Sequence, residues 1–147
     1  MILDDLVGQR FRDYDIVRRL GGGGFGSIFL VEHVRHRKPF VLKILHQSLL
    51  NEEDTVQRFC REAELLASLN HPNIVQMFDF DFDERLGFFL ILEWLKGQTF
   101  HELLEHAPLS YELIHVLFEQ LCAALSETHR RGILHRDLKP YNIMLLP

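Results

Sequence analysis

Six residues near the start of the chain, G-G-G-G-F-G at positions 21–26, constrain the fold more than any other feature of the sequence. The segments on either side, Tyr14–Leu20 and Ser27–His33, are rich in the β-branched and aromatic residues that favour strands. The second segment alternates between two faces, one of which carries Ser27, Phe29 and Val31. The glycines are therefore expected to join two strands of a sheet.

The spacing of these glycines limits the kind of nucleotide motif they could form. A dinucleotide-binding glycine motif opens a helix, and a Walker loop ends in Gly-Lys-Ser/Thr, whereas here a strand follows and no lysine adjoins the glycines. What remains is a hairpin, Gly21-x-Gly23-x-x-Gly26-x-Ile28, whose backbone can fold close over phosphates because no Cβ blocks the approach. Four consecutive glycines also suit a flexible turn, so this segment alone leaves both interpretations open.

A lysine and a glutamate in the next two elements form a second candidate feature. Lys43 lies within a third apolar strand, Pro39–Leu45, and a helix capped by Asn51 is expected from about Glu52 to Leu69. The apolar stripe of that helix consists of Val56, Phe59, Cys60, Ala63, Leu66 and Leu69. Glu62 lies beside this stripe, so it can face the sheet and meet Lys43.

The remaining pattern predicts an α+β fold. Strands at Ile74–Phe80 and Phe88–Leu92 complete a five-stranded antiparallel sheet with one helix. Beyond Gly97 the pattern becomes helical, with a short helix at Thr99–His106 and a long one capped by Ser110 that ends near Arg131, before Gly132. The apolar stripe of the long helix consists of Ile114, Leu117, Phe118, Leu121 and Leu125. Ile143–Leu146 is expected as a strand without a partner.

The segment H-R-D-L-K-P-Y-N, at positions 135–142, brings three kinds of reactive side chain into one loop. Its proline argues against a helix. Asp137 can accept a hydroxyl proton, Lys139 can neutralise a negatively charged transferring group, and Asn142 can offer an oxygen to a hard metal ion. These are the groups that phosphoryl transfer requires of a protein.

Composition limits the class of protein. The chain has 147 residues, 47% hydrophobic and 25% charged, which is typical of a globular domain, and its net charge of -5 disfavours nucleic acid or an anionic membrane as the main partner. The first ten residues do not form a signal peptide, and the longest apolar run, Leu86–Leu92, is too short to span a bilayer. Cys60 and Cys122 fit neither a disulfide framework nor a paired metal motif, so a reducing, cytoplasmic location is expected.

In their order and spacing, the glycine loop, the strand lysine, the helix glutamate, the connector after the fifth strand and H-R-D-L-K-P-Y-N resemble the eukaryotic-type protein kinase family. The likeness is greatest to bacterial serine/threonine kinases. It implies a leader at 1–13, an ATP-binding N-lobe at 14–95 and the first helices and catalytic loop of a helical C-lobe at 96–147. The family's second magnesium-binding aspartate, in D-F-G, and its activation segment would lie beyond Pro147, so an incomplete kinase domain is expected.

The resemblance implies ATP and Mg2+ as cofactors and protein serine or threonine hydroxyls as acceptors. Gly21, Gly23 and Gly26 would cover the phosphates, and Lys43, held by Glu62, would reach the α and β phosphates. The remaining nucleotide contacts would come from Ile28, Val41 and the backbone of Glu93 and Leu95, after a gatekeeper at Leu92. Val41 stands where the family usually has alanine, and its two extra methyl groups could crowd the adenine.

The resemblance also implies the roles of the loop residues. Asp137 would orient the acceptor hydroxyl and take its proton, Lys139 would stabilise the transferring phosphoryl group, and Asn142 would bind magnesium.

Two other functions are also compatible with the sequence. One is a non-catalytic, kinase-like fragment that binds a nucleotide or a protein partner. The other, ranked below it, is a small-molecule phosphotransferase of the aminoglycoside type, a family that tends to carry H-G-D where this chain has H-R-D-L-K-P. The remaining segments offer little to cover the apolar stripe of the long helix after Ser110, so self-association through this surface is expected.

Overall fold

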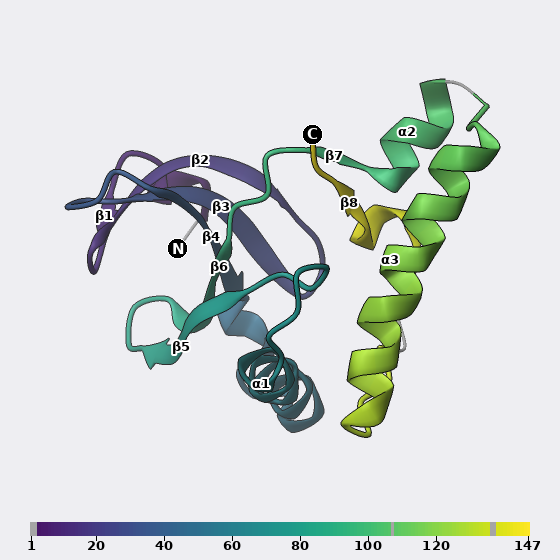
Figure 1. Ribbon diagram of the computed structural model, residues 1–147. Helices are drawn as coiled ribbons and strands as arrows, with labels where there is room; N and C mark the ends of the chain where they lie inside the picture. Colours follow the sequence, from purple (N-terminus) through teal and green to yellow (C-terminus); the bar gives the residue numbers. More distant parts are fainter. Residues whose placement is uncertain (1–2, 107, 136–137) are drawn as a thin grey trace. The chain divides into compact units, whose positions relative to one another are not determined.

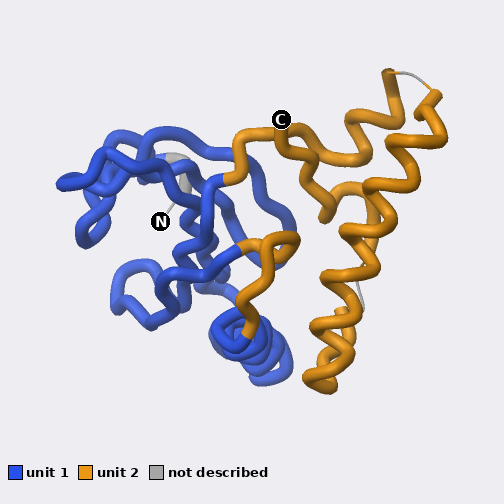
Figure 2. Tube along the Cα trace, viewed as in Figure 1, with its two compact units in different colours: residues 1–68, 76–94 blue, residues 69–75, 95–147 orange. Residues whose placement is uncertain are grey.

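The computed structural model describes residues 3–106, 108–135 and 138–147. The chain divides into two compact units (Figure 2). The first, called here the sheet unit, comprises residues 1–68 and 76–94. The second, the helical unit, comprises residues 69–75 and 95–147, so the segment after the first long helix belongs with the later helices. No helix in the described part of the chain has both the length and the apolar character needed to cross a bilayer.

The sheet unit contains one antiparallel sheet of six strands in the order β1-β2-β3-β4-β6-β5 (Figure 1). The strands are β1 (Arg10–Phe11), β2 (Tyr14–Gly22), β3 (Gly26–His33), β4 (Pro39–Leu45), β5 (Met77–Asp83) and β6 (Gly87–Glu93). The kinase-like α+β fold predicted from the sequence is confirmed, with one more strand than the five expected, because β1 is too short to show a periodic pattern. The expected strand at Ile74–Phe80 begins three residues later, since its pairing with β6 starts at Met77.

One face of the sheet forms a closed apolar core. It contains alternate residues of three central strands: Phe29 and Val31, Leu42 and Ile44, Phe89 and Ile91. Leu6 and Phe11 also belong to this core, and the Phe11 and Phe89 rings meet edge to face with centroids 4.9 Å apart. The first thirteen residues were expected to be only a leader, but through η1 (Leu3–Leu6) and β1 they help to cover the sheet.

The other face of the sheet is partly covered by helix α1 (Glu53–Ser68), after a short 3-10 helix, η2 (Gln47–Leu49). Phe59 and Ala63 are the buried residues of α1 and pack with Leu45 and Leu90 of the sheet. The prediction that Asn51 caps this helix is wrong. The amide of Val56 donates to the carbonyl of Glu52, so Glu52 occupies the position before the first helical residue.

The helical unit contains α2 (Phe100–His106), α3 (Tyr111–Arg130), the 3-10 helix η3 (Pro140–Asn142) and a two-stranded ribbon. Both predicted ends of α3 are confirmed. The Ser110 side chain accepts a hydrogen bond from the amide of Leu113, as an N-cap does. Gly132 has a φ of 75° and its amide donates to His129, while the amide of Ile133 donates to Thr128, which together form a Schellman motif.

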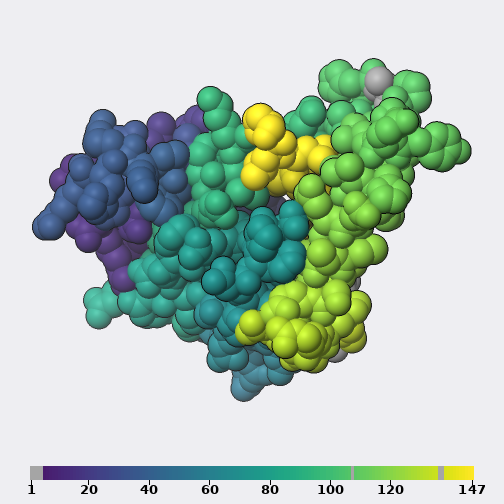
Figure 3. Space-filling view, in the orientation of Figure 1, coloured from purple at the N-terminus to yellow at the C-terminus, as the bar shows by residue number. Residues whose placement is uncertain are grey.

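The ribbon pairs β7 (Gln98–Thr99) with β8 (Met144–Leu145). The strand expected at Ile143–Leu146 therefore has a partner, contrary to the prediction. A two-residue strand beside a helix start carries no alternation that a sequence pattern could reveal. Gly97 precedes β7, and a Cβ at this position would collide with the carbonyl oxygen of Leu145, so the ribbon requires a glycine there. In Figure 3 the yellow C-terminal residues lie against green residues of the same unit.

Candidate functional site

The glycine hairpin between β2 and β3 contains two kinds of glycine. A Cβ on Gly21 or Gly23 would meet nothing within 4 Å, whereas a Cβ on Gly26 would collide with the carbonyl oxygen of Ile44. Gly22 has a φ of 155°, and its Cβ would lie 2.7 Å from the carbonyl oxygen of Gly26. Gly22 and Gly26 are therefore required by the hairpin's own backbone, while Gly21 and Gly23 border open space into which a ligand can come close to the main chain.

Gly22 does not belong to the spaced motif recognised in the sequence. Its positive φ identifies it as a structural glycine, and only the backbone shows this. The amide of Gly23 donates to the carbonyl of Gly26 at 3.0 Å and closes the turn.

The sheet face that carries Lys43 offers a half-buried apolar strip next to the hairpin. Ile28 of β3 pairs in register with Lys43 of β4, and Val41, two residues before Lys43, pairs with Leu92 of β6. All four of these side chains are half-buried, whereas each has an adjacent residue in its strand that points to the other face and is fully buried. The strip can accept a flat apolar group, and Lys43 places one cation at the end nearer the glycines.

Lys43 and Glu62 meet as expected from the sequence. The Nζ of Lys43 lies 2.7 Å from Oε1 of Glu62 on α1, and it lies 5.7 Å from the centroid of the Phe59 ring. The two side chains are 28% and 47% exposed. An ion pair this open to water contributes little to folding, so its effect is to hold the ammonium group in one place.

The residues at the end of β6 have defined backbone partners. The amide of Glu93 donates to the carbonyl of Gln76 at 2.8 Å, and the Glu93 carboxylate accepts from the amide of Gln76 at 3.3 Å. Any backbone contact from Glu93 to a ligand must therefore use its carbonyl oxygen. Leu95, the second residue expected to offer a backbone group, is half-buried in the helical unit.

In the helical unit, Asn142 lies at the end of η3. Its backbone amide donates to the carbonyl of Lys139 at 2.9 Å. The neighbouring Tyr141 stacks on His101 of α2 with ring centroids 3.9 Å apart, and its hydroxyl lies 2.7 Å from His101 Nε2. The amide of Phe100 donates to the carbonyl of Ile143. Contacts on both sides of Asn142 thus fix its position against α2.

Of the three reactive residues predicted in this loop, the structure describes Lys139, which is exposed, and Asn142. Asp137 lies outside the described residues. The support from His101 was missed, because the sequence pattern of the loop does not show which residue of α2 would face Tyr141.

A capping box begins α2 and supports the same ribbon. The amide and hydroxyl of Thr99 donate to the Glu102 carboxylate at 2.6 and 2.9 Å, and the Glu102 amide donates back to the hydroxyl at 3.1 Å. The hydrogen bond from the Thr99 amide, followed by that from its hydroxyl, lowers the pKa of Glu102 below its ordinary value. The spacing T-F-H-E in the sequence is the known signature of this motif and could have revealed it.

Comparison with known proteins identifies the family. Residues 14–146 match the protein kinase domain. The chain belongs to the protein kinase family. This membership agrees with the order of sheet, helix α1 and helical unit described above, and members of the family use ATP and magnesium.

Several bacterial relatives are similar over nearly the whole chain. It is 38% identical over 146 residues to the serine/threonine-protein kinase pkn3 of Myxococcus xanthus, covering 98% of this chain and 27% of that protein. It is 41% identical over 143 residues to Pkn1 of the same organism, covering 97% of this chain and 20% of that protein. For PrkC of Bacillus subtilis the identity is 33% over 142 residues, with 95% and 22% covered. The chain thus spans between 20% and 27% of the length of these relatives.

Proposed function

We propose that this chain forms the ATP-binding part and the catalytic loop of a protein serine/threonine kinase. The observation that carries the proposal is the 2.7 Å ion pair between Lys43 and Glu62, on the same sheet as a glycine hairpin in which Gly21 and Gly23 face open space. The names of the bacterial relatives support serine and threonine hydroxyls as acceptors.

The residues of the sheet unit suit the binding of a nucleoside triphosphate. Gly21 and Gly23 leave room for phosphate oxygens to come close to the main chain of the hairpin, and Lys43 provides the cation for the α and β phosphates. The carbonyl of Gly26 accepts the hydrogen bond from the Gly23 amide that closes the turn between β2 and β3. The adenine would lie on Ile28 and Val41. It would accept contacts from two backbone groups expected from the sequence: the carbonyl oxygen of Glu93, and a group of Leu95, which belongs to the helical unit.

The residue types of the catalytic loop are those that the transfer step requires. The acceptor hydroxyl attacks the γ phosphorus, the bond to the β-phosphate oxygen breaks, and the hydroxyl proton passes to Asp137. Lys139 offsets the negative charge of the transferring group, and the Asn142 amide oxygen would hold a magnesium ion, which neutralises phosphate charge when bound. Positioning and charge compensation supply most of the rate in such a reaction.

Two measurements on the same protein test this proposal. ATP binding with magnesium is measured by calorimetry, and transfer of labelled phosphate to a generic protein substrate is measured alongside it. Lys43→Met is expected to weaken ATP binding at least about tenfold, because a charged hydrogen-bonding group is removed from the phosphates. Lys38→Met, a change to an exposed lysine before β4, is the matched control and should leave binding unchanged.

Asp137→Ala separates the kinase from the non-catalytic alternative. It should keep ATP affinity and lower the transfer rate about 100-fold or more, the usual loss for a general base. A folded wild-type chain that binds ATP but gives no transfer in which Asp137 matters would favour the nucleotide-binding, non-catalytic function instead.

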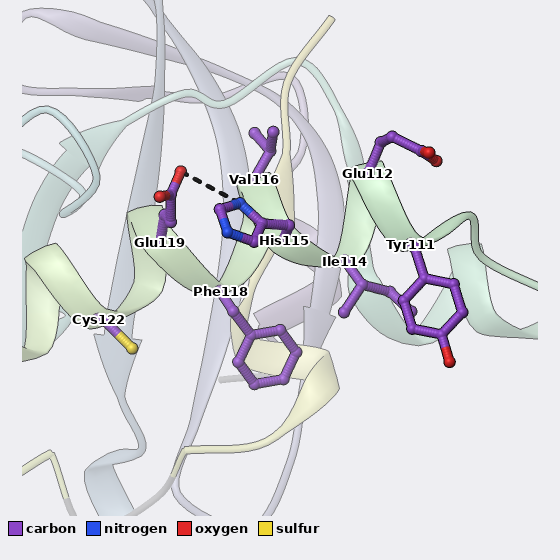
Figure 4. A pocket seen from close by; sticks show the side chains of 8 residues that line it. All are labelled: Tyr111, Glu112, Ile114, His115, Val116, Phe118, Glu119 and Cys122. Carbon is purple, nitrogen blue, oxygen red and sulfur yellow. Dashed lines mark ion pairs between the residues drawn. The ribbon is translucent and has the colours of Figure 1, made fainter.

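We further propose that α3 associates with a second copy of the chain. Tyr111, Ile114 and Phe118 are 89%, 36% and 53% exposed, and they line a shallow hollow on one side of the helix (Figure 4). An exposed apolar patch on a helix favours association. Light scattering should show Phe118→Glu shifting the chain toward the monomer, while Val17→Glu, at a residue 47% exposed on β2, should not. A wild-type chain that is monomeric at high concentration would contradict this.

We also propose that the protein functions in the cytoplasm. Cys60 and Cys122 are both free thiols, which suits a reducing compartment. Cell fractionation that found the chain only with membranes or outside the cell would contradict the proposal.

A further inference from the structure

His46 holds the glycine hairpin at two points. It follows the last residue of β4, and its amide donates to the carbonyl of Phe25, within the hairpin, at 3.1 Å. Its side-chain Nε2 lies 3.1 Å from Oγ of Ser27, the second residue of β3. One residue at the end of β4 therefore contacts both the turn and the strand that leaves it.

The Ser27 hydroxyl is completely buried and has a second partner on the opposite strand. Nη2 of Arg19, in β2, donates to it at 3.4 Å, and Nε of the same guanidinium donates to the carbonyl of Gly21, also at 3.4 Å. A hydroxyl offers one donor and two acceptor sites, so it can accept from Arg19 and still form a hydrogen bond with the His46 imidazole. Ser27 thus links the side chains of His46 and Arg19 at the base of β3.

These contacts are important because a run of glycines has no side chains that could restrict its backbone conformation. Each glycine has more conformational freedom to lose than any other residue, and Gly21 to Gly24 have no side chains through which packing could fix them. The three hydrogen-bonded positions, at Gly21, Phe25 and Ser27, lie on both sides of the turn. A loop ordered in advance loses less entropy when it closes over a ligand, and binding is tighter as a result.

We propose that His46 and Ser27 are positioning residues of the glycine hairpin that strengthen binding of the phosphates of a nucleotide without contacting them. The inference rests on the proposed function, since it assumes that phosphates lie under the hairpin. It predicts that the side-chain link acts on ATP and has little effect on adenosine, which has no phosphates for the hairpin to cover.

The test compares dissociation constants for ATP with magnesium and for adenosine, measured by calorimetry on the wild-type chain and its variants. His46→Ala and Ser27→Ala should each weaken ATP binding about threefold to tenfold, the range for one lost hydrogen bond, and should change adenosine binding less than about twofold. The double variant should bind ATP no more weakly than Ser27→Ala alone, because the His46 side chain acts through Ser27, whereas Ser27 also accepts from Arg19.

Two further variants separate positioning from general damage to the fold. His46→Gln keeps a polar group at a similar reach and should recover part of the ATP affinity. His33→Ala removes another half-buried histidine, at the far end of β3, and should leave both affinities unchanged. If His46→Ala does not fold, Ser27→Ala and His46→Gln still carry the comparison.

The outcomes distinguish this inference from the proposed function. Equal losses for ATP and adenosine would show a merely structural role and overturn the inference, as would unchanged ATP affinity in both alanine variants. A wild-type chain without ATP affinity, or one in which Lys43→Met binds ATP normally, would instead overturn the nucleotide-binding role on which the inference rests.

Discussion

The two units position their candidate residues by different physical means. In the sheet unit, Lys43 belongs to a strand whose neighbouring residues, such as Leu42 and Ile44, are completely buried. In the helical unit, the long helix α3 has only two buried residues, Ala124 and Thr128, while Phe118 is 53% exposed. The loop that carries Asn142 is held by hydrogen bonds, a ring stack and a two-residue ribbon rather than by an apolar core.

This difference indicates how each unit should respond to damage. A closed apolar core loses stability in proportion to the volume removed from it, whereas a unit held by local polar contacts loses stability one contact at a time. Substitutions that remove volume should therefore affect mainly the sheet unit, and substitutions at caps and turns should affect mainly the helical unit.

The largest effect is expected from emptying the sheet core. Phe89→Ala should lower the free energy of unfolding by about 3–5 kcal/mol, because Phe89 is completely buried. Urea unfolding followed by circular dichroism and by the fluorescence of Trp94, the only tryptophan, measures this change. Phe118→Ala, measured at a concentration at which the chain is monomeric, is the matched control and should cost far less. An equal loss in both variants would show that the α3 face is packed and would break the comparison.

A smaller effect is expected from crowding the ribbon. Gly97→Ala places a Cβ against the carbonyl of Leu145 and should lower stability by about 1–3 kcal/mol, the usual cost of overpacking. Gly24→Ala, where a Cβ would meet nothing within 4 Å, is the control. Amide hydrogen exchange at Leu145, and at Phe100, whose amide donates to the carbonyl of Ile143 beside the ribbon, should accelerate in the first variant alone. Unchanged exchange there would mean that the ribbon tolerates a side chain.

The N-cap of α3 should contribute less again. Ser110→Ala removes the acceptor for the Leu113 amide and should cost about 1 kcal/mol, whereas Ser110→Thr keeps a hydroxyl and should cost little. Hydrogen exchange in the first turn of α3 measures the change. If exchange rises equally in the sheet unit, the two units do not respond separately.

The smallest effect concerns acid. Hydrogen bonds from Thr99 lower the pKa of Glu102, so its contribution to stability is complete above the ordinary carboxyl pKa of 4.5 and is lost as pH falls through the lower folded value. Amides of α2 should lose protection in this range, and Glu102→Gln should remove that pH dependence.

The sheet unit provides the comparison for this titration. The amide of Phe82, and then Arg12, lower the pKa of Asp81 in the same direction. The buried strand β3 should nevertheless keep its protection at a pH where α2 has lost it. Loss of protection in β3 first would contradict the contrast between the units.

Sequence reasoning succeeded where one element determined the outcome. The alternation of β3 predicted that Ser27, Phe29 and Val31 share a face, and all three are completely buried. The apolar stripe of α1 placed Glu62 toward Lys43, and Ser110 and Gly132 predicted both ends of α3. Each of these depends on residues close together in the chain or on one strong periodicity.

It failed where the outcome depended on contacts between distant residues. Leu6 and Phe11 were assigned to a leader because η1 and the two-residue strand β1 are too short to show a hydrophobic periodicity. The partner of Met144 was missed because β7 is equally short. The roles of Gly22 and His46 follow from a backbone angle and from the position where β4 ends, which only the folded hairpin reveals.

The pairing of β7 with β8 has a consequence for the order of folding. Gln98 meets Leu145 only after the chain has passed through both helices of the unit. Helices form within about a microsecond. Bringing together residues that are far apart in the chain is slower, because the entropy of the closing loop is lost before the long-range contacts form. During synthesis, α2 and α3 should therefore form first, and the turn that carries Asn142 should be among the last parts of the unit to reach its native shape.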